Sequence, residues 1–267
     1  MDQRRDNADP DSAAASGSRA PTASLPQATA EPVIPVSECF TSIQGEGALT
    51  GVPSFFVRTS GCNLRCAWCD TPYASWDPEG EPMPLADVVR RAEASGVSHV
   101  VLTGGEPLIQ KNLPALARAL KNRGFHITIE TAGTVAADPS DTPCDLLSLS
   151  PKLANSTPAA DDPRDPSGAW RERHERRRLD VSTLQRLLDA YPSRQFKFVV
   201  ATEADLAEID RLVDRLTGWR PHEVMLMPEG VTPLGAAAHW VAQACIERDW
   251  RYCHRVHIEL FGDTRGT

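Results

Sequence analysis

Short apolar runs alternate with amphipathic segments from Val33 to the C-terminus. Residues 54–58 are typical of a buried strand, whereas the apolar residues of segment 85–95 recur with a helical period. Further strands are predicted at residues 97–102, 125–129, 145–149, 195–200, 223–227 and 255–258. Strands that alternate with helices are typical of a parallel sheet with crossover helices, so we predict an α/β fold.

Amphipathic segments separate most of these strands. Helices are predicted from Leu113 to just before Gly124, over residues 181–188 and 206–216, and from a cap at Thr232 with Pro233 in the first turn. The segment from Thr131 to Cys144 is too short for a good crossover helix, so one unit of the sheet is expected to lack one.

Residues 153–178 form a long polar stretch that interrupts this alternation. It holds an aspartate-rich part at 161–166 and an arginine-rich part at 171–178. A solvated helix of mixed charge is the favoured interpretation of the arginine-rich part. A binding patch is the alternative for that part, and an active-site lid is a further one for the long stretch.

Residues 1–32 contain no aromatic side chain and only Leu25 as a large branched aliphatic. Such a segment cannot offset its ordering entropy, so we expect a disordered tail at 1–32 and one folded domain at 33–267. No stretch approaches the roughly 18 consecutive apolar residues of a membrane helix, and no secretory signal is present. We therefore expect a cytoplasmic protein without a membrane partner.

The chain has 267 residues, of which 41% are hydrophobic, enough to bury a core. It carries 28 Lys and Arg against 36 Asp and Glu, a net charge of −8. A negative chain is poorly suited to phosphate backbones, so nucleic acid is not expected as a partner.

Three of the seven cysteines, Cys62, Cys66 and Cys69, lie within eight residues directly after a predicted strand. Three thiolates on one loop can bind a soft metal or an iron–sulfur cluster. Structural zinc normally uses two pairs of ligands, and the sequence has no second Cys-x-x-Cys. A cluster with one open iron is therefore favoured over zinc and over simple electron carriage. Cys39, Cys144, Cys245 and Cys253 are scattered and are interpreted as small core residues.

Several short polar motifs follow the predicted strands. In a β/α barrel the carboxyl ends of the strands share one rim, where active sites are built. The motifs on this rim are Gly104–Pro107, Glu130–Thr131, Ser150–Lys152 and Met227–Gly230, together with the cysteine loop. Gly, Pro and Ser also mark ordinary turns, but four motifs on one rim indicate a shared site.

The cysteine spacing, with Trp68 before the last cysteine, and the motif Thr103–Pro107 resemble the radical S-adenosylmethionine superfamily. Within it, Ile43–Gly47, Cys69–Thr71 and Ser150–Lys152 resemble the 7-carboxy-7-deazaguanine synthase family. The resemblance runs from Val33 to the C-terminus. It implies an incomplete, modified (β/α) TIM-like barrel of the radical S-adenosylmethionine type, usually a homodimer.

The resemblance also implies three groups of ligand contacts. Cys62, Cys66 and Cys69 would hold a [4Fe–4S] cluster, and Thr71 a Mg²⁺ ion. S-adenosylmethionine would contact Trp68, Cys69, Asp70, Gly104, Gly105, Glu106, Ser150, Pro151 and Lys152. The substrate would contact Ile43, Gln44, Gly45, Arg58 and Thr103. Glu46 is expected to be structural, and Glu130 to face either cofactor or substrate.

The implied reaction is a radical ring contraction in queuosine and 7-deazapurine biosynthesis. A lyase of this family converts 6-carboxy-5,6,7,8-tetrahydropterin to 7-carboxy-7-deazaguanine with loss of ammonia. Flavodoxin or ferredoxin is the implied electron donor, and no residue is assigned a catalytic role beyond positioning cofactor and substrate. The segment 262–267 is expected either to be free or to close over the pterin.

Two rival functions remain at this point. One is another radical S-adenosylmethionine enzyme, such as an activase that places a glycyl radical on a partner, although Gln44–Gly47 favours the pterin enzyme. The other is a binding module that zinc or a cluster only stabilises, which would leave Thr103–Pro107 unexplained.

Overall fold

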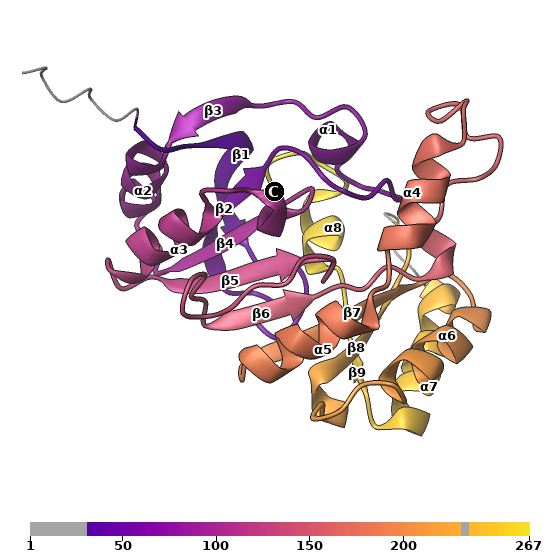
Figure 1. Cartoon of the computed structure of the whole chain (residues 1–267). Helices are drawn as coiled ribbons and strands as arrows, with labels where there is room; N and C mark the ends of the chain where they lie inside the picture. Colours follow the sequence, from indigo (N-terminus) through magenta and orange to yellow (C-terminus); the bar gives the residue numbers. More distant parts are fainter. Residues whose placement is uncertain (1–30, 231–234) are drawn as a thin grey trace, which may run out of the picture. The chain divides into compact units, whose positions relative to one another are not determined.

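The computed structural model describes residues 31–230 and 235–267 (Figure 1). Nine strands in this part of the chain form one sheet, in the order β3-β1-β2-β4-β5-β6-β7-β8-β9. The strands are β1 Val33–Ile43, β2 Pro53–Thr59, β3 Glu81–Pro84, β4 His99–Gly104, β5 His126–Thr131, β6 Leu146–Leu149, β7 Arg194–Val200, β8 Val224–Pro228 and β9 Arg251–Tyr252.

The sheet is parallel from β2 to β9, whereas β1 runs antiparallel to both β2 and β3. The two ends of the strand order are β3 and β9, and among the described residues these two strands do not pair with each other. The α/β class and the incomplete barrel are therefore confirmed. Because the parallel strands all end on the same side, their carboxyl ends form one rim.

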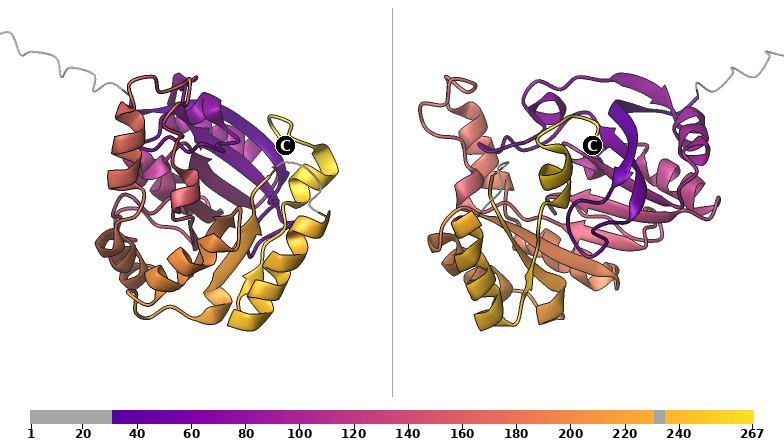
Figure 2. Two further views of the ribbon diagram at one scale, coloured as in Figure 1. Left: turned by 90° about the vertical axis from the view of Figure 1, so that its right-hand side faces the viewer. Right: turned by 180° about the vertical axis from the view of Figure 1, so that it is seen from behind.

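Helices and short turns connect the strands, and Figure 2 shows them from two further sides. The α-helices are α1 Pro72–Ser75, α2 Leu85–Ala94, α3 Leu113–Lys121, α4 Ala169–Arg177, α5 Val181–Ala190, α6 Ala204–Val213, α7 Gly235–Arg248 and α8 Val256–Phe261. The 3₁₀ turns are η1 Pro107–Ile109, η2 Ala154–Ser156 and η3 Pro221–Glu223.

The core lies between the parallel strands and the helices that cover them. Val100 and Leu102 of β4 and Phe196 and Phe198 of β7 are fully buried. The predicted apolar stripe of α3, which includes Leu116, is buried as well. Such strands read as continuous apolar runs because both of their faces are covered.

The helix predicted at 181–188 is confirmed, and it has a clear N-terminal cap. In α5, the Asp180 carboxylate accepts hydrogen bonds from the backbone N–H groups of Ser182 and Thr183, which satisfies two donors at the helix start. The expected lack of a crossover helix is confirmed, because residues 132–145 between β5 and β6 hold turns and no helix.

Other predictions differ from the structure. The strand predicted at 255–258 is wrong, because this segment begins α8, whose first N–H donates to Gly45 O at 2.9 Å. The hydrogen bond from Val256 to Gly45 fixes the start of this segment as a helix, although Val256 and Ile258 alternate as in a strand. The antiparallel strands β1 and β3 were not predicted, since their exposure is mixed.

Two predictions fall where the structure gives no description. The tail at 1–32 lies outside the described residues except for Glu31 and Pro32, and the helix start at Thr232 and Pro233 also lies outside them. Of the helices that the structure describes, none has both the length and the apolar character needed to cross a bilayer.

Candidate active site

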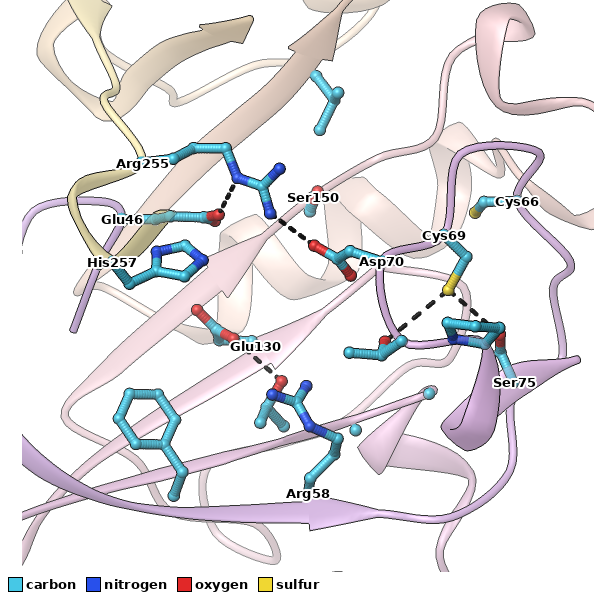
Figure 3. Close-up of a pocket in the computed structure, with 18 of the residues that line it drawn as sticks. Glu46, Arg58, Cys66, Cys69, Asp70, Ser75, Glu130, Ser150, Arg255 and His257 are labelled. Carbon is cyan, nitrogen blue, oxygen red and sulfur yellow. Dashed lines mark hydrogen bonds and ion pairs between the residues drawn. The ribbon is translucent and has the colours of Figure 1, made fainter. Parts of the chain in front are cut away.

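A cavity of about 580 Å³ opens at the rim formed by the carboxyl ends of the parallel strands (Figure 3). Most of the residues predicted for the site line this cavity. They are Ile43, Gln44, Gly45, Arg58, Cys62, Cys66, Trp68, Cys69, Asp70, Thr71, Thr103, Gly104, Gly105, Ser150 and Lys152. Glu106 and Pro151 do not line it. The fold thus brings residues more than 100 positions apart in the sequence into one cavity.

The three cysteines lie on the loop that follows β2, and all three are free thiols. Burial raises the pKa of Cys62 and of Cys66 to about 12, so without a bound metal both thiols are protonated at neutral pH. A cluster is ligated by thiolates, so its binding has to release these protons.

Neighbouring elements fix the path of the cysteine loop, residues 62–69. Arg65 N–H donates to His174 Nδ1 at 3.1 Å, and Ala67 N–H donates to Ser156 O at 2.8 Å. From the other side, Trp76 Nε1 donates to Cys66 O at 2.9 Å. The backbone of the loop is therefore held at three points before any cofactor binds.

The donor set fits an iron–sulfur cluster. The thiols line one cavity, and thiolates are the usual ligands of iron in such clusters. A zinc ion needs all of its ligands around one position. In a cubane iron–sulfur cluster, each thiolate binds a different iron. Within residues 31–230 and 235–267, no three His, Cys, Asp or Glu side chains converge on a single ion position.

Gly105 brings the end of β4 directly against Cys62 of the cysteine loop, and Gly104 lies against Thr59 at the end of β2. A Cβ on Gly105 would lie 2.5 Å from Ala74 O and 2.7 Å from Cys62 Cβ. Gly104 has φ of +144°, and a Cβ there would lie 2.6 Å from Thr59 N. These glycines are needed for packing within the protein, in addition to any contact with S-adenosylmethionine.

Glu106 is hydrogen-bonded within the protein. Its side chain is fully buried and accepts hydrogen bonds from Leu108 N, Thr131 Oγ1 and Ala132 N at 2.8–3.0 Å. Its oxygens are thus used within the protein, where they cap η1 and join β4 to β5. These contacts give Glu106 a structural role, and its expected contact with the ammonium of S-adenosylmethionine stays a prediction.

The residues expected near S-adenosylmethionine form a small polar group. Lys152 Nζ donates to Ser150 Oγ at 2.7 Å and lies 5.4 Å from the centre of the Trp68 ring. Trp68 in turn donates from Nε1 to Asn155 at 3.3 Å. An ammonium, a hydroxyl and an indole face therefore meet beside the cysteines, as a charged and partly aromatic ligand requires.

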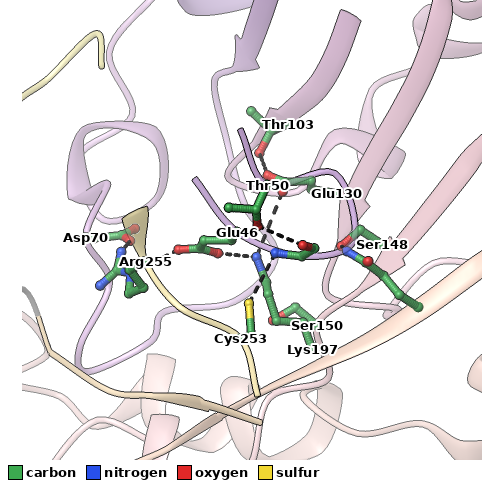
Figure 4. Close-up of polar contacts among 12 residues, drawn as sticks. Glu46, Thr50, Asp70, Thr103, Glu130, Ser148, Ser150, Lys197, Cys253 and Arg255 are labelled. Atoms are coloured by element: carbon green, nitrogen blue, oxygen red, sulfur yellow. Dashed lines mark hydrogen bonds and ion pairs between the residues drawn. The ribbon is translucent and has the colours of Figure 1, made fainter. Parts of the chain in front are cut away.

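A chain of alternating charges crosses the cavity wall (Figure 4). Arg255 bonds Asp70 at 2.6 Å and Glu46 at 2.9 Å, Lys197 bonds Glu46, and Lys197 Nζ lies 3.9 Å from Glu130 Oε1. Burial alone would raise the pKa of Glu46, but the two cations more than offset it and hold that pKa well below its usual range. Burial alone would lower the pKa of Lys197, but the carboxylates raise it, so the ammonium stays charged.

Arg58 and Glu130 also line the cavity, and they lie on the strands β2 and β5. Arg58 Nε donates to Glu38 at 2.6 Å, and among the described residues nothing accepts from its Nη atoms. Glu130 Oε2 accepts from Thr103 Oγ1 at 3.0 Å. Glu130 therefore lies beside Thr103, one of the residues expected to contact the substrate.

The C-terminal segment closes one side of the cavity. Asp263 to Thr267 belong to its lining. Arg265 bonds Glu79 at 2.9 Å, and its guanidinium lies 3.9 Å from the centre of the Tyr73 ring. Of the two expectations for this segment, free or closed over the cavity, the structure shows the second arrangement.

Comparison with known proteins decides the family. The profile described as "Radical SAM superfamily" matches residues 56–191. The chain is 50% identical over 235 residues to a 7-carboxy-7-deazaguanine synthase from Rhodopirellula baltica, covering 87% of this chain and 88% of the relative. It belongs to the 7-carboxy-7-deazaguanine synthase family.

Other members of the family agree with this assignment. The 7-carboxy-7-deazaguanine synthase of Halobacterium salinarum is 43% identical over 88% of this chain and 93% of its own length. The crystal structure of QueE from Escherichia coli matches with a TM-score of 0.62 and 26% identity, over 84% of this chain and 95% of that one. A radical SAM protein binds a [4Fe–4S] cluster and S-adenosylmethionine, so these two cofactors follow from the family. The activase and the structural zinc module are not supported.

The charged or titratable cavity residues that were not predicted from the sequence include Lys197, Arg255 and His257. Lys197 carried a usable signal, because a lysine between Phe196 and Phe198 of a fully buried strand needs a buried partner. Arg255 and His257 carried none, since the segment was predicted to be a strand.

Proposed function

We propose that the chain converts 6-carboxy-5,6,7,8-tetrahydropterin to 7-carboxy-7-deazaguanine with loss of ammonia. The observation that carries the proposal is the single cavity that joins the three cysteines to Arg58, Gln44 and Thr103. The names of the relatives give the same product. Bound together, the cluster and S-adenosylmethionine would supply the one-electron chemistry, and the protein would supply position and shielding.

On the cofactor side, Cys62, Cys66 and Cys69 would ligate the cluster. Lys152 and Ser150 would bind the polar end of S-adenosylmethionine, with Trp68 and Asp70 beside them and Gly104 and Gly105 offering backbone. Lys152 fits this role because its ammonium already faces the cavity and has a neutral partner, the Ser150 hydroxyl.

On the substrate side, Arg58 would bind the pterin carboxylate. Its Nε is fixed by Glu38, which leaves the planar fork of Nη atoms for the carboxylate. Gln44, the backbone at Ile43 and Gly45, and Thr103 would bind ring donors and acceptors. Glu130, placed beside Thr103 and 3.9 Å from Lys197 Nζ, would accept from a ring N–H group.

Thr71 would bind Mg²⁺ through Oγ1, together with the substrate carboxylate and waters. Mg²⁺ prefers oxygen ligands and keeps several waters, so one protein hydroxyl suffices. Thr71 lines the cavity, and its Oγ1 lies 3.8 Å from Cys69 Sγ. The C-terminal segment 263–267 would exclude solvent from the reacting ring.

We also propose that the protein is a homodimer that works in the cytoplasm and receives electrons from flavodoxin or ferredoxin. The experiment is an anaerobic assay of the reconstituted protein with dithionite, S-adenosylmethionine, Mg²⁺ and the pterin, read by mass spectrometry. The proposal predicts 7-carboxy-7-deazaguanine with the wild-type protein and none with Cys66→Ala. Release of 5′-deoxyadenosine that does not depend on the pterin would show that the substrate is wrong.

A further inference from the structure

Helix α4 carries a dense group of arginines beside the cysteine loop. We call Arg171, Arg173, Arg176 and Arg177 the α4 arginine patch, and all four are exposed. The segment 169–178 holds five arginines against two glutamates, although the chain as a whole has a net charge of −8. The patch is thus a locally positive surface on a protein whose net charge is negative.

Direct contacts join α4 to the cysteine loop. The Arg65 guanidinium lies 3.8 Å from the centre of the Trp170 ring, and Arg65 N–H donates to His174. Arg177 Nη1 reaches Asn63 O at 3.5 Å, next to Cys62. Because these contacts hold the loop against α4 (labelled in Figure 1), the patch lies next to the loop that carries the three cysteines.

The charge of the patch is available to a partner. Among the described residues, Arg171, Arg173 and Arg177 have no carboxylate partner within ion-pair distance. Arg176 pairs with Glu172 at 3.7 Å, but both side chains are at least 67% exposed, so water screens the pair. Buried ion pairs such as Lys197–Glu46 neutralise each other's charge, but the arginines of the patch have no such buried partner among the described residues.

We propose that the α4 arginine patch is the docking surface for an acidic protein that carries single electrons. This rests on the proposed function, in which the cluster has to be reduced. The carrier would lose one electron and the cluster would gain one, with no bond formed or broken at the surface. Complementary charge would steer the carrier to α4 and orient it toward the cysteine loop.

The position of the patch favours this occupant over a nucleic acid. An arginine patch built for phosphates would need a field that extends over the surface, but the rest of the chain is acidic. An electron-carrier protein needs only a local electrostatic attraction beside the cluster. The side chains that turn from α4 to the cysteine loop, His174 and Trp170, keep the two together.

The test reverses charge on α4 with Arg173→Glu and Arg176→Glu in one variant. The matched control carries Arg90→Glu and Arg91→Glu on the exposed side of α2, which packs near β1 and β3 away from α4. Both variants change the net charge equally. The probe is an acidic FMN flavodoxin, and its binding to the cluster-loaded protein is measured by calorimetry at low ionic strength.

The proposal predicts binding weakened by about ten-fold in the α4 variant and unchanged in the control. Turnover supported by reduced flavodoxin falls by about the same factor, whereas turnover with dithionite stays within about two-fold. Added salt weakens binding to the wild-type protein more than binding to the α4 variant, because it screens the same charges.

Other results overturn the docking surface. Equal weakening in both variants would mean general charge repulsion, and unchanged binding would place the carrier elsewhere. A change in oligomeric state on size exclusion would make α4 an interface between copies, and transfer RNA that displaces flavodoxin from the patch would make it a nucleic-acid site. If the wild-type protein makes no product with either reductant, the proposed function fails, while the calorimetry still decides whether α4 binds the carrier.

Discussion

His174 offers a quantitative test of how the cysteine loop is held. Its ring is fully buried, and its Nδ1 accepts from Arg65 N–H at 3.1 Å while its Nε2 lies 2.9 Å from Ser156 Oγ. Since Ser156 donates its own hydrogen to Leu153 O, Nε2 has to carry the ring proton. The imidazole is therefore neutral and fully bonded, and it joins α4 to the loop.

Replacing His174 by Ala leaves the buried Arg65 N–H without an acceptor. Such a group costs about 1–3 kcal/mol, and the lost ring volume adds to this, so we expect the free energy of unfolding to fall by about 3 kcal/mol. The loop then loses one of its three anchors, and the iron bound per chain after reconstitution falls. Asn at 174 keeps an acceptor near the position of Nδ1 and is expected to restore part of both.

The same histidine predicts a pH dependence. Burial lowers the pKa of His174 from 6.5 to about 4, because a second ring proton would be desolvated, and the charges of Arg178 and Lys152 act in the same direction. Above pH 6.5 the ring is neutral in both states and costs nothing. As the pH falls from 6.5 toward 4, the unfolded chain binds the proton first, so the stability of the folded protein decreases by at most about 3 kcal/mol.

Urea unfolding of the cluster-free protein at several pH values, with iron analysis of the reconstituted protein, measures both effects. The wild-type protein is expected to lose stability across this pH window more steeply than His174→Ala. If the variant keeps wild-type stability, iron content and pH dependence, the idea that His174 braces the cysteine loop is refuted. Lost stability with full iron content would limit its role to general packing.

Three further substitutions test other parts of the site. Gly105→Ala forces a methyl group against Cys62, so we expect about 2 kcal/mol of lost stability and a protein that retains little iron, and normal iron analysis would contradict the close packing. Lys197→Met leaves the buried Glu46 with one cation instead of two, so urea unfolding should show a loss of about 3 kcal/mol or more, whereas a stabilised variant would show that the ammonium is dispensable. Arg58→Lys removes the planar fork, so KM for the pterin should rise about ten-fold with iron content unchanged, and an unaltered KM would remove Arg58 from the substrate site.

Local sequence patterns predicted the strands and helices of the sheet well where apolar residues are continuous. Residues 97–102 and 195–200 were predicted as strands because a run buried on both faces leaves a clear signal, and both form strands of the sheet. The C-terminal segment failed for the opposite reason. Val256 and Ile258 alternate as in a strand, but the conformation there is set by contact with Gly45, which lies more than 200 residues away.

The candidate site was predictable where chemistry is concentrated in short motifs. The cysteine loop and the glycines at the end of β4 could be recognised from the sequence. Three cysteines on one loop, or two adjacent glycines directly after a strand, are an unusual pattern. Glu106 belongs to the same motif, yet only the structure shows that its carboxylate is consumed by backbone and Thr131. Arg255 reaches Glu46 across 209 positions, and no local pattern records such a pair.

The central claim is that one cavity holds the pterin against S-adenosylmethionine. The most direct measurement supplies pterin deuterated at C6 to the reconstituted protein under turnover and follows the label by mass spectrometry. We predict deuterium in the S-adenosylmethionine pool of the wild-type protein, formed together with 7-carboxy-7-deazaguanine, and none with Cys66→Ala. Product that forms while S-adenosylmethionine stays unlabelled would contradict the shared cavity, because C6 and the cofactor would then never exchange hydrogen.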